Sequence, residues 1–482
     1  MYLTSSDDVR YTQNVEVLDS FVDAIAADPR IEPHGLILQQ HGRRILETYW
    51  HPHRRGQLRL VYSLSKTFTG TALGLAVGDG LLSLDDKVVD LLPDLAAEVD
   101  EHTARMTVRH LASMATGHAE ETLLTAMLAD PDDLVGSFLR LPPQHEPGTC
   151  FAYNQPPVLA LSTILHRVTG RRLVDQLRSR VLDPIGIGDL RWAQYRPGVD
   201  VGFSGVFTDL DAIARLGQLY LDDGMWAGRR ILPEGWVREA SRLQTDNSWQ
   251  DDPDWSLGYG IQLWMCRHGF RGDGAFGQYM IVIPEADAVV AFFSHTLLMQ
   301  SFMDLVWEQL LPALLTDTGW SARPEVPPDT AERSEVPAHR TLPTASALHG
   351  ADAALDAVAD GRFAPEPGTP VHPSIIAVEV RGDMLLIHER TDGDAAGRES
   401  GDPMYVPLRR EWTDVPDHPI AASAAVDGDG RLLVDLAVLA SPHRLEMTLD
   451  PTTSTFRAQW PVPPLFGLGL ADALHRMCPP ER

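Results

Sequence analysis

The sequence predicts an α+β domain followed by a small all-β domain. Up to about residue 318, segments of helical periodicity alternate with short runs of strand character. Between residues 321 and 345 the chain is rich in Pro, Glu, Ser and Thr and has no apolar periodicity, which is typical of an exposed linker. Beyond it, short alternating runs are separated by turns. We therefore expect a first domain at 1–320, a linker at 321–345 and a second domain at 346–482.

Periodicity and capping residues define the elements of the first domain. Residues 36–38 and 44–49 predict a hairpin around a polar turn. Residues 63–79 predict a helix that begins near Ser63 and stops at Gly80. The remaining predicted elements are helices at 158–168, 173–181 and 209–221, and strands at 259–265, 278–284 and 288–294.

The second domain reads as strands throughout. Its alternating runs predict a small antiparallel sheet or barrel. The predicted strands are 375–381, 384–388, 405–409, 420–426, 432–439, 443–449 and 455–459.

Composition excludes several classes of partner. A hydrophobic content of 44% and a charged content of 22% are typical of a soluble globular protein. The formal charge of −27 argues against nucleic acid or an anionic membrane as a partner. No uncharged apolar run reaches transmembrane length, and the N-terminus lacks the pattern of a secretory signal. We therefore expect a soluble, cytoplasmic protein without a nucleic-acid or membrane partner.

The cysteines and histidines do not predict a cofactor. Cys150, Cys266 and Cys478 are odd in number and widely spaced, so they indicate neither a disulfide framework nor a metal cluster. His51 and His53 lack further ligands at a useful spacing. We expect no metal and no cofactor.

Lysine is nearly absent, with Lys66 and Lys87 standing against thirty-eight arginines. Arginine keeps its proton near neutral pH, so lysine is the cation that can act as a base. Lys66 follows Ser63 by three residues and shares its face if the helix begins there. The helix dipole and burial would both favour the neutral amine that a general base requires. The alternative is a capping serine beside a solvated lysine.

Further motifs accompany Ser-x-x-Lys in a fixed order. They are residues 106–117 (MTVRHLASMATG), 147–155 (PGTCFAYNQ), 207–215 (FTDLDAIAR) and 229–233 (RRILP). Together they resemble the serine β-lactamase and penicillin-binding-protein superfamily, in the branch that holds class C β-lactamases, D-amino-acid peptidases and esterases.

The resemblance extends from about residue 30 to about residue 315 and implies an architecture. We expect a β-lactamase-like antiparallel sheet covered by helices, with an all-α lobe from about residue 85 to 200 and the active site between the two. The second domain would be the lipocalin-like barrel that follows the catalytic domain in several relatives.

The resemblance also implies catalytic roles. Ser63 would be the nucleophile, Lys66 its base and Tyr153 the residue that shuttles a proton. A free tyrosine titrates near pH 10, so Tyr153 would need a neighbouring cation such as Lys66. The backbone N–H groups of Ser63 and Ala275 would form the oxyanion hole.

The sequence departs from the second family motif, Tyr-x-Asn, which here reads Tyr153-Asn154-Gln155. Gln155 keeps the amide but places it one methylene further out. We expect Gln155 to contact the substrate, in a position that the sequence does not define.

The third motif, usually Lys or His, a small residue and Gly, departs further. Its matching residues are Gly272, Asp273 and Gly274, so the cation that binds a substrate carboxylate in β-lactamases and carboxypeptidases is missing. We expect Asp273 and Gly274 at the substrate. Candidates to replace the cation are Arg267, His268, Arg271 and His295, each of which could equally be a structural partner. The aromatic residues Trp255, Tyr259 and Trp264 are expected in the core, although one could line the acyl pocket.

Three functional hypotheses follow. The first is a serine hydrolase that cleaves an ester or amide of a small molecule or peptide through a Ser63 acyl-enzyme. The second is a penicillin-binding-protein-type thioesterase that cyclises nonribosomal peptides, with a carrier protein as partner. The third is a binding protein on a degenerate hydrolase scaffold, which the retention of Ser63, Lys66 and Tyr153 disfavours. The sequence does not define the oligomeric state.

Overall fold

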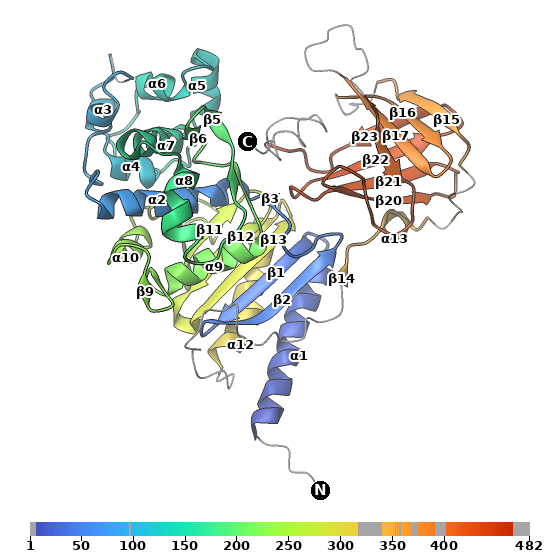
Figure 1. Cartoon of the computed structure of the whole chain (residues 1–482), viewed down its shortest axis with the longest axis horizontal. Coiled ribbons are helices and arrows are strands. Elements are labelled where there is room, and N and C mark those ends of the chain that lie inside the picture. The colour runs from blue at the N-terminus through green and yellow to red at the C-terminus, as the bar shows by residue number, and fades with distance from the viewer. Residues whose placement is uncertain are drawn as a thin grey trace. The chain divides into compact units, whose positions relative to one another are not determined.

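The computed structural model describes residues 6–95, 98–316, 340–351, 353, 355, 358–368, 374–390 and 402–465, with side chains from residue 16 onward. The chain divides into two compact units (Figure 1). The first comprises residues 1–48 and 61–337, and the second comprises 49–60 and 338–482. The predicted linker at 321–345 lies almost wholly outside the described residues, so the domain boundaries stay a prediction.

Helices are distributed along the whole of the first unit. In chain order they are α1 (Ser6–Ala27), α2 (Ser65–Gly78), α3 (Val88–Leu91), α4 (Val108–Ala112), α5 (Leu123–Ala129), α6 (Leu134–Arg140), α7 (Pro156–Thr169), α8 (Leu173–Leu177), α9 (Leu210–Leu221), α10 (Trp236–Ala240), α11 (Met299–Leu305) and α12 (Leu311–Leu315). Single turns of other helical types are η1 (Tyr62–Leu64), η2 (Thr103–Arg105), η3 (Arg178–Leu182), η4 (Pro284–Ala286) and η5 (Val306–Leu310).

An antiparallel sheet forms the centre of this unit, with strands in the order β10-β11-β12-β13-β1-β2. Its members are β1 (Glu32–Gln40), β2 (Arg43–His51), β10 (Trp264–Cys266), β11 (Gly269–Gly274), β12 (Gln278–Ile283) and β13 (Ala288–His295). Short strands elsewhere are β4 (Arg191–Trp192), β5 (Gln194–Arg196), β6 (Val199–Asp200), β7 (Val206–Thr208), β8 (Met225–Trp226) and β9 (Arg229–Arg230). The predicted hairpin and the strands at 278–284 and 288–294 are confirmed.

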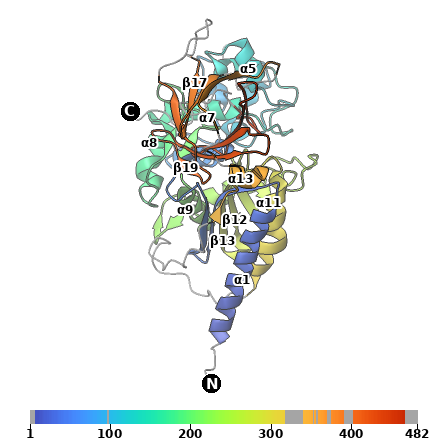
Figure 2. The same ribbon diagram turned by 90° about the vertical axis from the view of Figure 1, so that its right-hand side faces the viewer.

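Helices cover both faces of the sheet (Figure 2). Helix α9 packs across β1, β12 and β13, while α1 and α11 lie together on the opposite side. The close approach of α9 depends on Gly217, because a Cβ there would lie 2.5 Å from Val289 on β13. Asp209 caps α9 by accepting a hydrogen bond from the backbone N–H of Ala212. The expected helix-covered antiparallel sheet is confirmed.

The predicted all-α lobe is present as α3 to α8, which occupy residues 88–177, with short strands β4 to β6 at its end. Helix α7 is its centre and contacts α2, α4, α6 and α8. Two prolines open α7, where missing N–H groups cost nothing, and Gly170 closes it in the left-handed conformation. The predicted helices at 158–168 and 173–181 are confirmed, the second ending as the turn η3.

The predicted strand at 259–265 is wrong over most of its length. Only β10 forms there, starting at Trp264. Gly258 has a φ of +99° and Gln262 a φ of +57°, and neither angle is compatible with a continuous strand. The apolar alternation therefore belongs to a looped segment whose side chains are nevertheless buried.

The second unit is an all-β domain, as predicted. A nine-stranded, barrel-like sheet has the order β18-β17-β16-β15-β23-β22-β21-β20-β19. Its elements, with those that adjoin it, are β3 (Arg59–Leu60), β14 (Arg340–Thr341), α13 (Ala345–His349), β15 (Gly361–Pro365), β16 (Ile375–Arg381), β17 (Met384–Glu389), β18 (Met404–Pro407), β19 (Thr413–Asp414), β20 (Ile420–Val426), β21 (Leu432–Val438), β22 (Arg444–Asp450) and β23 (Thr455–Gln459). Among the described residues, no helix of either unit is long and apolar enough to cross a membrane.

Candidate active site

Ser63 lies in the turn η1, directly before α2, and is only partly exposed. The preceding residue, Tyr62, has a φ of +48°, a left-handed conformation that costs a bulky residue about 1–3 kcal/mol. Ser65 stabilises the turn, because its hydroxyl donates to the carbonyl of Tyr62 at 2.6 Å and accepts from the backbone N–H of Val206 at 3.0 Å. The surrounding structure therefore enforces the turn that carries Ser63.

Lys66 is buried, with 1% of its surface exposed, and its Nζ has three hydrogen-bond acceptors. These are Ser63 Oγ at 3.1 Å, Gln155 Oε1 at 2.8 Å and the carbonyl of Phe203 at 2.9 Å. A neutral amine has two donors and one lone pair. When Lys66 is neutral, its donors can stay on Gln155 and Phe203 while its lone pair accepts the proton of Ser63 Oγ. The arrangement suits either protonation state without movement.

Burial lowers the pKa of Lys66 from its usual value near 10.5 to about 7. Asp273 and Glu121 act in the opposite direction, because their negative charges favour the ammonium form. None of the three hydrogen-bond acceptors of Lys66 Nζ is a carboxylate. Near neutral pH a substantial share of Lys66 is therefore an uncharged amine.

Tyr153 lies in the loop before α7, and its ring is held by other aromatic rings. It stacks on Trp264 with centroids 5.2 Å apart and meets Tyr259 edge-on at 6.1 Å. Lys66 Nζ lies 4.7 Å from the centre of the Tyr153 ring. Burial and the charge of Asp273 raise the pKa of Tyr153, while a hydrogen bond with Ser63 lowers it in part. Tyr153 is therefore a neutral phenol whose hydroxyl meets Ser63, and Lys66 is the better base.

The departure in the second motif is accommodated. Gln155 occupies the N-cap position of α7 without a side-chain capping bond, and its side-chain oxygen reaches Lys66 despite the extra methylene. The middle residue, Asn154, is buried and structural, since its side-chain oxygen accepts from the backbone N–H and the hydroxyl of Thr122, both at 3.0 Å.

Two glycines let β11 approach the nucleophile turn closely. A Cβ at Gly272 would lie 2.2 Å from Thr67 Oγ1, and one at Gly274 would lie 2.1 Å from the carbonyl oxygen of Val61. The end of β11 therefore lies against the backbone just before Ser63. The missing third-motif cation has a local cause, because α2 packs where the side chain of residue 272 would begin.

The turn after β11 is tied to the nucleophile turn by an aromatic pair. Phe276 has a φ of +66°, and its ring meets that of Tyr62 edge-on at 5.2 Å. These residues adjoin Ala275 and Ser63, whose N–H groups the family resemblance assigns to the oxyanion hole. The ring contact thus holds the chain segments that carry Ala275 and Ser63 close together.

Asp273 forms a buried ion pair with Arg271 on the same strand. Arg271 has no exposed surface, and its Nε donates to Asp273 Oδ2 at 3.0 Å. Its Nη1 donates to the carbonyls of Asp254 at 2.8 Å and Met265 at 3.1 Å, and the ring of Trp255 covers the guanidinium at 4.4 Å. Arg271 is therefore enclosed by the protein, although its Nη2 is buried without a hydrogen-bond partner among the described residues.

The other residues considered as replacements for the missing cation have protein partners as well. Arg267 forms an ion pair with the buried carboxylate of Asp254 at 2.9 Å, and His268 pairs with Glu285. His295 packs against an aromatic ring. Among the described residues, no group of three His, Cys, Asp or Glu side chains could hold a metal ion.

The end of α4 connects the two sides of the site. The carbonyl of Ala112 accepts from the backbone N–H and the side-chain amide of Gln262, at 3.0 and 2.8 Å. The carbonyl of Met114 accepts from the backbone N–H of Ala152 at 3.1 Å, next to Tyr153. This short segment therefore fixes the loop that carries Tyr153 relative to the loop that leads into β10.

Sequence reasoning missed two parts of this site. The carbonyl of Phe203 binds Lys66, and a backbone group has no sequence signature. The role of Trp264 under Tyr153 was left open, because aromatic residues near a site are usually core. The signal in the sequence that could have predicted this role is the position of Trp264 close to Tyr259, in a segment rich in aromatic residues.

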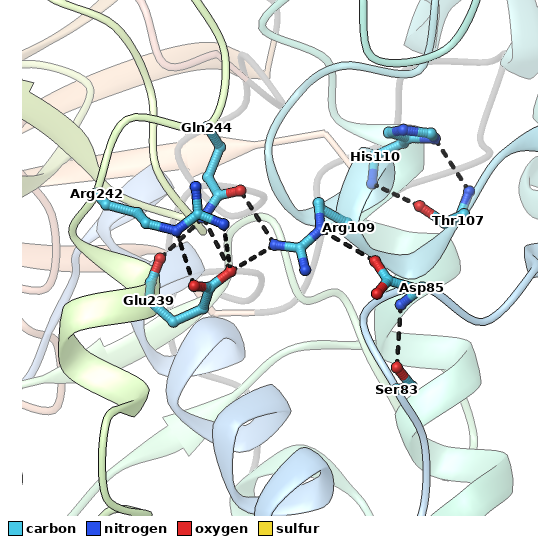
Figure 3. Close-up of polar contacts among 8 residues, drawn as sticks. All are labelled: Ser83, Asp85, Thr107, Arg109, His110, Glu239, Arg242 and Gln244. Carbon is cyan, nitrogen blue, oxygen red and sulfur yellow. Dashed lines mark hydrogen bonds and ion pairs between the residues drawn. The ribbon is translucent and has the colours of Figure 1, made fainter.

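A polar network outside the site joins α4 to α10 (Figure 3). Arg109 is at its centre, pointing one way toward Asp85 and the other toward Glu239 and Gln244. Its Nε donates to Asp85 at 3.2 Å, and its Nη1 donates to Glu239 at 2.5 Å and to Gln244 at 3.2 Å. Arg242 makes two further bonds to Glu239, both at 2.8 Å. The network has a structural role, with every labelled charge paired.

Comparison with known proteins identifies the family. The family model described as Beta-lactamase matches residues 18–311. The chain is 24% identical over 257 residues to 6-aminohexanoate-dimer hydrolase of Paenarthrobacter ureafaciens, covering 49% of this chain but only 65% of that protein. It is 24% identical over 294 residues to penicillin-binding protein 4 of Amycolatopsis lactamdurans, covering 52% of this chain and 76% of that one.

A solved structure has the same fold. EstCE1, titled a hydrolase with promiscuous acyltransferase activity, matches with a TM-score of 0.51 and 17% identity, over 64% of this chain and 100% of that one. At this level of identity the likeness to EstCE1 shows the fold alone. Because the family model matches more than half of the chain, the protein belongs to the beta-lactamase family.

Proposed function

We propose that the protein is a serine hydrolase that cleaves an ester or amide through an acyl-enzyme on Ser63. The observation that supports this most is the environment of Lys66. A buried amine with a pKa of about 7, two neutral acceptors and Ser63 Oγ as its third neighbour is suited to take a proton from serine.

The residues suggest the following sequence of steps. Neutral Lys66 takes the proton of Ser63 Oγ as this oxygen attacks the substrate carbonyl carbon. The negative charge that develops on the carbonyl oxygen would be bound by the N–H groups of Ser63 and Ala275. Tyr153 would pass a proton to the leaving alcohol or amine and recover one from Lys66. Water then attacks the acyl carbon, and the proton transfers run in the opposite direction. The acid leaves as Ser63 Oγ recovers its proton.

The relatives support the class of reaction but not the substrate. One is named for hydrolysis of a 6-aminohexanoate dimer and another as a penicillin-binding protein. Gly272 in place of a cation disfavours substrates that are recognised through a carboxylate, as β-lactams and D-alanine peptides are. An uncharged or differently charged ester or amide is the better proposal.

Covalent labelling tests the proposal. The protein and its Ser63→Ala variant are incubated with a fluorophosphonate probe and with a fluorescent penicillin, and the intact masses are measured. We expect a fluorophosphonate adduct on the parent that is absent from the variant. No adduct with either probe between pH 6 and 9 would contradict the proposal and favour the binding-protein alternative. Addition of an amine acceptor, with amide product measured against acid, distinguishes acyl transfer from hydrolysis.

A further inference from the structure

A carboxylate lies on β11 next to the candidate active site, at a position where the third motif usually carries a small uncharged residue. Asp273 follows Gly272 and precedes Gly274, the two positions at which β11 touches the nucleophile turn. It keeps 7% of its surface exposed, whereas its partner Arg271 keeps none. The charge of Asp273 acts on both Lys66 and Tyr153. The carboxylate is therefore close to the reacting groups.

The cation of the Asp273 pair cannot reach a ligand. Arg271 Nε donates to Asp273, and its Nη1 donates to backbone carbonyls and to Cys266. The ring of Trp255 covers the guanidinium. The two members of the pair thus differ in exposure, because Arg271 has no exposed surface while Asp273 keeps 7% of its own.

Glu121 adds a second negative charge. It is exposed, and its Oε1 accepts from the backbone N–H of Gln155 at 3.3 Å, the same residue whose side-chain amide binds Lys66. Glu121 and Asp273 are the two charged groups that act on Lys66. Since Lys66 loses its own charge near neutral pH, these two carboxylates favour a cation near Ser63, and the positive charge of Arg271, which also acts on Tyr153, opposes them in part.

We infer that Asp273 is a specificity-determining residue that selects acyl donors carrying a protonated amine and rejects those carrying a carboxylate. This inference rests on the proposed function, because it names the substrate class of the same site. Two residues along a strand span about 7 Å, so Asp273 lies within about that distance of Ala275 and of the carbonyl oxygen that Ala275 would bind. A flexible aminoalkyl chain can cover such a span.

Electrostatics predict the size of the preference. Opposite charges near a protein surface attract strongly enough to change binding by an order of magnitude, and part of that is lost to solvent screening. We expect an ammonium group on the acyl chain to raise kcat/KM by about tenfold over a neutral chain, and a carboxylate to lower it by about tenfold. The preference should fall in high salt.

Three esters of equal chain length test the inference. They are methyl 6-aminohexanoate, methyl heptanoate and monomethyl pimelate, which end in an ammonium, a methyl and a carboxylate group. The ratio of kcat/KM for the ammonium ester to that for the neutral ester is the readout, because general damage to the site lowers both alike. The expected order is ammonium, then neutral, then carboxylate.

Variants assign the preference to Asp273. Asp273→Asn should bring the ratio close to one while the neutral ester is still hydrolysed. Because this change leaves Arg271 buried without its partner, the double variant Arg271→Met with Asp273→Asn provides a second test without an unpaired charge. Glu121→Gln should reduce the ratio less, since Glu121 is exposed.

The outcomes separate the two proposals. A neutral ester that is hydrolysed without any preference for the ammonium ester, or a ratio unchanged in the single and double variants, overturns the role of Asp273 alone. No hydrolysis of any ester, together with no labelling of Ser63, overturns the proposed function itself.

Discussion

Two cations of the first unit, Lys66 and Arg109, illustrate opposite uses of burial and pairing. Lys66 is buried among neutral acceptors, and its pKa falls to about 7. Arg109 is partly exposed and forms ion pairs with the carboxylates of Asp85 and Glu239. One of the two lysines of the chain therefore lies where burial favours the neutral amine, whereas Arg109 lies where carboxylates pair with its charge.

The largest expected loss of activity comes from replacing Lys66 with arginine, the residue type of Arg109. Lys66→Arg keeps a cation but removes the ability to give up a proton, so the rate of Ser63 acylation should fall by about 10³-fold. The measurement is the rate of fluorophosphonate labelling, with unfolding temperature as the control for folding. Labelling within tenfold of the parent would show that Lys66 is not the base.

Tyr153→Phe should have the next largest effect. The phenyl ring can keep its stacking on Trp264 while the hydroxyl at Ser63 is lost. We expect kcat for an ester to fall by about 10²-fold with little change in KM, which is typical of a lost proton relay. An unchanged kcat would remove Tyr153 from the mechanism.

Gly272→Ala tests the close packing of β11 on α2. The new Cβ would lie 2.2 Å from Thr67 Oγ1, so we expect a loss of about 1–3 kcal/mol of unfolding free energy. Gly188→Ala is the matched control, because nothing lies within 4 Å of the Cβ position there. Equal stability of the two variants in urea unfolding would contradict the proposed cause of the missing cation.

The smallest effect is expected at the structural cation. Arg109→Met removes contacts to two carboxylates but leaves Glu239 paired with Arg242, and Arg109 is partly exposed. We expect about 1 kcal/mol of destabilisation and a kcat/KM within about threefold of the parent. A pH profile shifted from that of the parent would instead show that the Arg109 network acts on the site.

The sequence was sufficient for the fold, and it singled out residues that the structure brings together around Lys66. Ser63 and Lys66 were predicted because helical spacing brings residues three apart together. Tyr153 and Gln155 depended on the family resemblance, since no local rule joins them to a lysine nearly ninety residues away. The Arg271 to Asp273 pair and the carbonyl of Phe203 were not predicted, because burial and backbone approach depend on packing between distant segments.

The incorrect prediction of a strand at 259–265 also shows that contacts between distant segments cannot be read from a local pattern. Its apolar alternation is real, but the positive φ of Gln262 and the bond of its backbone N–H to Ala112 are fixed by the neighbouring lobe. Tertiary contacts override local pattern where a loop has to join two parts of the site.

The pH dependence of kcat/KM for a neutral ester tests the central claim most directly. If Lys66 is the base, activity should rise with pH as Lys66 loses its proton, with an apparent pKa near 7. Asp273→Asn removes a negative charge that holds this pKa up, so the rise should move to lower pH in that variant. A profile that is flat from pH 6 to 9, or one that rises only toward the usual lysine value, would contradict the account of Lys66 as a buried, neutral base.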